Sequence, residues 1–155
     1  MGQNGNAFEC RMCGQCCQGE GGIILGSLDI QRLCKGLGLS REDFLAKYTL
    51  RQNHKTQLLS QNGNCIFFSR DQGCLVHTHK PDICRAWPFF QGNLRDEQSW
   101  LLAQDYCPGI NQDVEHQEFV HQGLEYLQQN KLIYSSQDPE APAALLKDDQ
   151  GLECK

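Results

Sequence analysis

Four cysteines stand close together near the start of the chain, in the run Cys10-Arg11-Met12-Cys13-Gly14-Gln15-Cys16-Cys17. A C-x-x-C pair can direct two thiolates into one coordination sphere from a tight turn, and Gly14 provides the backbone freedom that such a turn often needs. Cys16 and Cys17 are adjacent and therefore harder to aim at one small ion. One of them is thus a candidate ligand for a second site or for a multi-iron cluster. The spacing predicts a metal-binding loop.

Four further cysteines, Cys65, Cys74, Cys84 and Cys107, follow in the middle of the chain. Cys65 and Cys74 lie on either side of a predicted hairpin turn, and the other two each lie beside a bend that contains a proline. With the loop cysteines they make eight candidate ligands, twice the number that a closed tetrahedral site needs. Two allocations stay open: closed zinc sites, or an iron–sulfur cluster together with a structural ion.

Other potential ligands have simpler interpretations. His77 and His79 alternate along a predicted strand and so share one face, where an imidazole could replace a thiolate. We nevertheless interpret both His77 and His79 as ordinary surface histidines. Cys34 falls on the apolar face of a predicted helix and is interpreted as a small core residue. Cys154 is an isolated thiol near the end of the chain.

Charged and aromatic residues near the cysteines are expected to support the site. Arg85 follows Cys84 directly and is expected to pair with Asp82, with Asp29 or with the negative charge of a thiolate-bound centre. The run Trp87-Pro88-Phe89-Phe90 is interpreted as core that covers the metal, with a substrate-stacking wall as the alternative. No G-x-G-x-x-G, P-loop, G-x-S-x-G or H-E-x-x-H motif occurs, so no catalytic residue is assigned.

Composition limits the compartment and the partners. The chain has 155 residues, 10 of them cysteine, and a formal net charge of −5. No secretory signal is visible at its N-terminus, so we expect a reducing, cytoplasmic location, where dense cysteines favour metal or redox chemistry over disulfides. Apolar runs are far shorter than the about 20 residues that cross a bilayer, and no Lys/Arg cluster marks a nucleic-acid surface. Neither a membrane nor a nucleic acid is an expected partner.

Short helices are predicted around the cysteines. One covers residues 28–35, between Ser27 as N-cap and Gly36, and a second begins after Ser40 in a variant of the capping box. A third begins near Pro81 and carries Cys84. The longest helical candidate covers residues from about 112 to 129, with an apolar stripe of Val120, Leu124 and Leu127.

Strands complete the predicted fold class, which is α+β. The β-prone runs are residues 56–60, 65–69, 74–77 and 99–102, and the first three predict two small hairpins. We therefore predict a small single domain at residues 1–134, with short helices and β-hairpins gathered around a cysteine-ligated metal centre. Its motif core covers 8–108 and its helical extension 111–130. The composition of residues 135–155 predicts a disordered tail.

Taken together, these positions form the pattern Phe8-x-Cys10-x-x-Cys13-Gly14-x-Cys16-Cys17, then Cys65-x-Phe67, then Cys74-x-x-His77-x-x-x-Pro81-x-x-Cys84-Arg85-x-x-Pro88-Phe89, and then Cys107-Pro108. In this pattern the chain resembles the YkgJ-like cysteine-cluster family, described as a zinc- or iron-chelating domain. The resemblance covers residues 8–108. It implies that the metal ligands are Cys10, Cys13, Cys16, Cys17, Cys65, Cys74, Cys84 and Cys107.

The resemblance implies a metal-binding protein first. Its cofactor would be zinc or an iron–sulfur cluster, with a 4Fe-4S cluster as one option. The family includes flagellin lysine N-methylases, in which the cysteine motif is linked to an iron–sulfur cluster and S-adenosylmethionine. The alternative is therefore an iron–sulfur-dependent enzyme of methyl transfer or redox chemistry that acts on a protein or a small molecule. A further alternative is an interaction module whose tail or last helix docks a protein partner.

Overall fold

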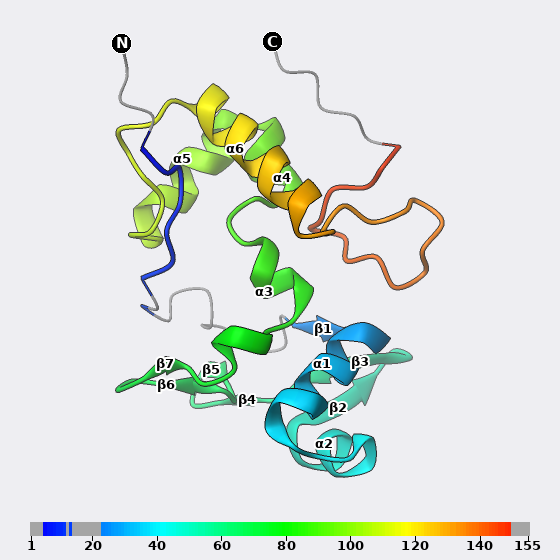
Figure 1. Ribbon diagram of the computed structural model, residues 1–155. Helices are drawn as coiled ribbons and strands as arrows, with labels where there is room; N and C mark the ends of the chain where they lie inside the picture. Colours follow the sequence, from blue (N-terminus) through cyan, green and yellow to red (C-terminus); the bar gives the residue numbers. More distant parts are fainter. Residues whose placement is uncertain (1–4, 12, 14–22, 150–155) are drawn as a thin grey trace. The chain divides into compact units, whose positions relative to one another are not determined.

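The computed structural model describes residues 5–11, 13 and 23–149. Contacts within the chain group it into two compact units. Unit 1 comprises Met1–Cys13 and Ala86–Lys155, and unit 2 comprises Gly14–Arg85. Helices and short antiparallel strands occur together, which confirms the α+β class (Figure 1).

Two helices, α1 (Ser27–Leu37) and α2 (Arg41–Tyr48), form the predicted helical pair of unit 2. The N-cap of α1 is Gly26 and not the predicted Ser27, because the Asp29 carboxylate reaches back to accept the Gly26 N–H at 3.0 Å. The N-cap of α2 is Ser40, as predicted, and its hydroxyl accepts the N–H of Asp43 at 3.1 Å. Local capping chemistry therefore determines where both helices begin.

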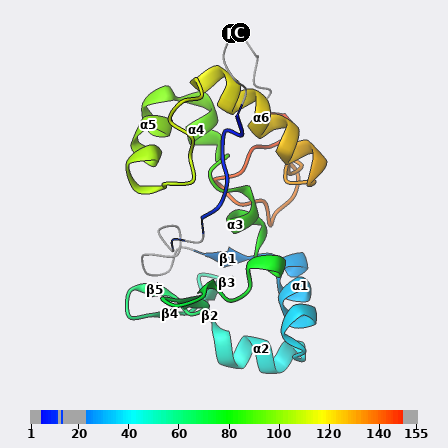
Figure 2. The same cartoon turned by 60° about the vertical axis from the view of Figure 1, so that its left-hand side comes forward.

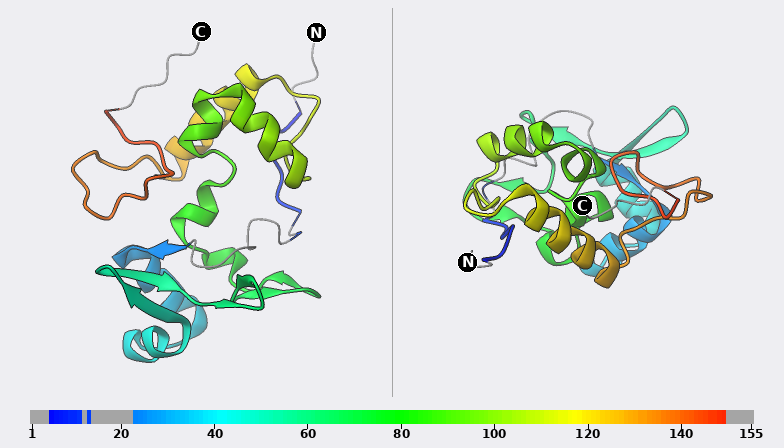
Figure 3. Two further views of the ribbon diagram at one scale, coloured as in Figure 1. Left: turned by 180° about the vertical axis from the view of Figure 1, so that it is seen from behind. Right: turned by 90° about the horizontal axis from the view of Figure 1, so that it is seen from above.

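The strands of unit 2 form three small antiparallel sheets. They are β1 (Ile24–Leu25), β2 (Thr49–Gln52), β3 (Lys55–Leu58), β4 (Ser60–Gln61), β5 (Asn64–Cys65), β6 (Phe68–Ser69) and β7 (Gly73–Cys74). The hairpins β4–β5 and β6–β7 confirm the two predicted hairpins. The third sheet has the order β1-β3-β2, and Figure 3 shows α1 and α2 beside it.

Residues 77–79, predicted as part of a strand, form a 3-10 helix, His77–His79. The His79 N–H donates to the Val76 carbonyl at 3.0 Å, which closes a tight turn two residues before Pro81. A proline has no N–H to donate to a neighbouring strand. The extended run therefore does not continue through Pro81. The His79 ring then lies so close to Gly36 of α1 that a Cβ at Gly36 would overlap it.

One apolar cluster joins the helices and sheets of unit 2. Its buried members are Leu25, Ile30, Leu33, Phe44, Leu58, Phe67 and Val76. Cys34 is half-buried against this cluster, in keeping with its position on the apolar face of α1. Cys65 and Cys74 also pack on the cluster, so the same core supports both hairpins.

Unit 1 contains the helices α4 (Gln91–Arg95), α5 (Glu97–Tyr106) and α6 (His116–Gln129), which Figure 2 shows gathered together. The prediction of a strand at 99–102 is wrong, because these residues lie within α5. The carboxylate of Asp96 accepts the Ser99 N–H at 3.1 Å, which caps the helix, and Trp100 and Ala103 are buried at helical spacing. Of the helices described, none is long and apolar enough to cross a membrane.

Helix α6 begins later than predicted, and its buried residues are Phe119, Gly123 and Leu127. Of the predicted stripe, Leu127 is buried and Val120 packs, partly buried, against the same core. A Cβ at Gly123 would lie 2.6 Å from Cδ1 of Phe89, whose ring is buried. The backbone of α6 therefore approaches Phe89 more closely than any other residue type would allow.

We expect Gly123→Ala to destabilise the protein by about 1–3 kcal/mol, because the Phe89 ring must shift within a packed core. Gly92→Ala is the matched control, since Gly92 is also helical and a Cβ there meets no atom within 4 Å. In the control, the better helix propensity of alanine should stabilise the protein by up to about 1 kcal/mol. Urea unfolding of both variants measures the difference. Equal midpoints would show that Phe89 moves at no cost.

Part of the C-terminal segment differs from the predicted disordered tail. Leu145 and Leu146 are buried in unit 1, and Tyr134 forms a parallel bridge with Lys147. Gln91 at the start of α4 donates its backbone N–H to the Ala144 carbonyl at 2.9 Å. An adjacent leucine pair thus gives a mostly polar segment enough apolar surface to pack. Residues 150–155, with Cys154, lie outside the described residues.

Candidate metal centre

The structure describes six of the eight predicted ligands. Unit 1 contains Cys10, Cys13 and Cys107, and unit 2 contains Cys65, Cys74 and Cys84. Cys16 and Cys17 lie outside the described residues. Within residues 5–11, 13 and 23–149, no three His, Cys, Asp or Glu side chains are close enough to hold one ion.

In unit 1, strand-like pairing aligns the start of the cysteine loop with the chain that follows Cys107. Phe8 and Ile110 form an antiparallel bridge, and the Glu9 N–H donates to the Gly109 carbonyl at 2.9 Å. Cys10 comes two residues after Phe8, and Cys107 comes three residues before Ile110. Because the two segments run in opposite directions, both cysteines lie toward the same end of the pairing.

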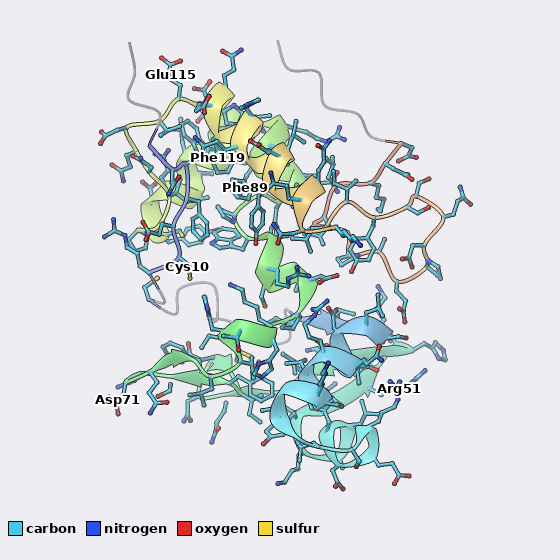
Figure 4. The ribbon with its side chains drawn as sticks, in the orientation of Figure 1. Cys10, Arg51, Asp71, Phe89, Glu115 and Phe119 are labelled. Carbon is cyan, nitrogen blue, oxygen red and sulfur yellow. The ribbon has the colours of Figure 1, made fainter. Side chains whose placement is uncertain are left out.

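Two features permit this pairing. Gly109 has no side chain, and a Cβ there would overlap the carbonyl oxygen of Glu9. The Phe8 ring lies edge-on to Phe89 at 6.1 Å, and Phe89 packs against Phe119 at 5.0 Å. Figure 4 shows Phe89 and Phe119 together in unit 1 and labels Cys10 on the N-terminal segment. The aromatic core therefore anchors the segment that leads to Cys10.

Cys107 is buried and has a defined partner. The Trp87 indole Nε1–H donates to Cys107 Sγ at a distance of 3.4 Å. Trp87 itself stacks on Tyr106, with ring centroids 5.6 Å apart, and meets the edge of Phe90 at 5.2 Å. Within the predicted aromatic run of unit 1, Phe89 lies in the core, whereas Trp87 contacts the predicted ligand Cys107.

The two hairpin cysteines of unit 2 occupy equivalent places. Each is the last residue of the second strand of a hairpin: Cys65 is paired with Ser60, and Cys74 with Phe68. Both are half-buried. A pocket of about 190 Å³ opens beside Cys65, lined by Gln61, Asn62, Asn64, Cys65, Phe68 and Arg70.

An ionic cluster holds the start of α3 (Asp82–Ala86), the helix that carries Cys84. Asp82 Oδ1 accepts from the guanidinium of Arg85 at 2.7 Å and from that of Arg32 at 3.0 Å. The predicted pairing of Arg85 with Asp82 is confirmed. Arg32 was not predicted as a partner, because it lies on α1, far from Asp82 in the sequence.

Asp29 connects the same cluster to the start of α1. One of its oxygens accepts the backbone N–H of Asp82 at 2.9 Å, and the other accepts that of Gly26. Arg32 donates to the Lys80 carbonyl at 3.0 Å. Burial raises the pKa of the Asp29 carboxyl, and the two backbone N–H bonds oppose that rise. Helix α1 thus fixes the backbone two residues before Cys84.

The histidines take separate positions. His77 Nε2 lies 3.5 Å from the Lys80 ammonium. Burial, followed by the charge of Lys80, lowers the pKa of His77 and so favours the neutral imidazole. The His79 ring packs on α1, with Nδ1 at 3.1 Å from the Thr78 hydroxyl. The His79 Nε2 is buried and has no hydrogen-bond partner among the described residues.

Comparison with known proteins gives one match. A family model described as "Putative zinc- or iron-chelating domain" matches residues 9–108. This range covers more than half of the chain and includes all eight predicted ligands. No curated protein and no solved structure matches the chain.

Proposed function

Because this chain belongs to the CxxCxxCC family of zinc- or iron-chelating domains, we propose that its eight motif cysteines are the ligands of a zinc or iron–sulfur centre. The observation that best supports the proposal is the pairing of Phe8 with Ile110, since it directs Cys10 and Cys107 toward the same end although they are far apart in the sequence. The proposed ligands are Cys10, Cys13, Cys16, Cys17, Cys65, Cys74, Cys84 and Cys107.

The donor chemistry fits such a centre. Thiolates are soft ligands that suit zinc and iron–sulfur clusters, whereas magnesium and calcium take oxygen ligands. The hydrogen bond from Trp87 to Cys107 has the form found around metal-bound thiolates, where N–H donors balance the negative sulfur.

The test is metal and acid-labile sulfide content in protein purified without oxygen. Cys107→Ser changes a proposed ligand of unit 1, and Cys65→Ser changes one of unit 2. Cys34→Ser is the matched control, because Cys34 is half-buried like Cys65 but lies on α1 outside the motif. We expect both ligand variants to lose metal relative to the wild type and the control to keep it.

The same measurement identifies the metal. About four iron and four sulfide per chain would indicate a cubane cluster, and zinc without sulfide would indicate closed thiolate sites. If the wild type binds neither metal, or if Cys34→Ser loses as much as Cys65→Ser and Cys107→Ser, the proposal fails.

A further inference from the structure

Trp87 is the one described side chain with an indole N–H directed at a proposed ligand. Its Nε1 lies 3.4 Å from the sulfur of Cys107, and Cys107 is only 7% exposed. Indole is a donor only, while sulfur is a weak acceptor as a thiol and a much better one as a thiolate. The hydrogen bond therefore favours the thiolate form of Cys107, which is the form that binds a metal.

The position of Cys107 explains why a donor is needed there. Cys107 is the C-cap of α5, and its own N–H donates to the Ala103 carbonyl at 3.0 Å. The C-terminal end of a helix carries partial negative charge, which is unfavourable for a thiolate. The indole N–H points the positive end of its dipole at the Cys107 sulfur and so offsets this partial negative charge.

Two aromatic neighbours hold the Trp87 ring in place. It stacks on Tyr106 with an interplanar angle of 26°, and it meets the edge of Phe90 at 78°. Tyr106 is the residue directly before Cys107. The same turn of chain therefore carries the sulfur and the ring on which the Trp87 indole stacks. A donor that is already oriented loses little conformational freedom when the metal arrives.

We propose that Trp87 is a positioning residue for the metal centre, which orients the Cys107 sulfur through its indole N–H and balances the charge of the metal–thiolate bond. This inference rests on the proposed function, in which Cys107 is a ligand. Removing such a supporting hydrogen bond typically weakens metal binding by about 10- to 100-fold.

The test uses Trp87→Phe, which removes the N–H and keeps an aromatic ring. Trp100→Phe is the matched control: the chain has two tryptophans, and the Trp100 Nε1 is buried with no hydrogen-bond partner among the described residues. Cobalt(II) is the probe, because its thiolate charge-transfer band reports on the sulfur ligand. We expect Trp87→Phe to bind cobalt about 10- to 100-fold more weakly and with a shifted band, and Trp100→Phe to bind like the wild type.

Fluorescence gives a second, independent readout. Trp100→Phe leaves Trp87 as the sole tryptophan, so its emission should change when zinc or cobalt is added. Trp87→Phe leaves Trp100 as the sole tryptophan, and its emission should stay nearly constant. A merely structural role for Trp87 would lower stability without shifting the charge-transfer band.

The outcomes separate the two proposals. If the wild type holds no zinc, cobalt or iron–sulfur centre, the proposed function fails. If the wild type binds and Trp87→Phe has the same affinity and the same band, the metal site stands and the role of Trp87 is overturned.

Discussion

Stripping the metal is expected to unfold the hairpin region of the protein. A structural zinc with thiolate ligands contributes about 10–16 kcal/mol at neutral pH, which is comparable to the whole stability of an ordinary domain, about 5–15 kcal/mol. The hairpins that carry Cys65 and Cys74 have strands of only two residues each. Such hairpins are marginal in water without further support.

Thermal unfolding and hydrogen exchange, before and after chelation, measure this effect. We expect chelation to lower the midpoint strongly and to remove amide protection from residues 60–75. Protection in α6 should persist longest, because Phe119 and Leu127 are fully buried in an aromatic core.

The control is re-addition of different metals. Zinc, or iron with sulfide under reducing conditions, should restore the midpoint, whereas calcium and magnesium should not, because thiolates are poor ligands for them. An unchanged midpoint after complete removal of the metal would show that the fold does not depend on it.

Local signals in the sequence correctly predicted several elements of the fold, including those that carry candidate ligands. The Ser40 cap, the β4–β5 hairpin turn at Asn62-Gly63 and the short helix after Pro81 each depend on residues within a few positions of one another. The hairpin positions of Cys65 and Cys74 follow from the same kind of signal. Capping and turn chemistry can be recognised without knowledge of the tertiary structure.

The features that the sequence did not predict depend on contacts between residues far apart in the chain. Residues 99–102 have β-prone side chains, yet the cap at Asp96 and the burial of Trp100 place them in α5. The pairing of Phe8 with Ile110 and the approach of Arg32 to Asp82 join distant parts of the sequence. Neither pairing has a local pattern, so the sequence indicated candidate ligands but not the contacts that position them. The same applies to the contact between Trp87 and Cys107.

Asp82→Asn is expected to destabilise unit 2 strongly. The Asp82 side chain is 7% exposed and receives both Arg85 and Arg32. Removal of one partner from a buried ionic group typically costs about 3–5 kcal/mol, because the remaining charges lose their compensation. The two arginine side chains are 27% and 29% exposed, so water can reach them and the loss should be near 3 kcal/mol, the lower end of that range.

Urea unfolding of Asp82→Asn against Asp71→Asn measures this cost. Asp71 is also in unit 2, but it lies exposed in the turn between β6 and β7, so its substitution should change stability by less than about 0.5 kcal/mol. Asp82→Asn should also reduce metal content if Cys84 is a ligand, since the ionic cluster fixes the first residues of α3. If Asp82→Asn is as stable as Asp71→Asn, the hydrogen bond from the Asp82 N–H to Asp29 is sufficient to hold α3. If Asp82→Asn is less stable but keeps its full metal content, metal binding does not depend on how the ionic cluster holds α3.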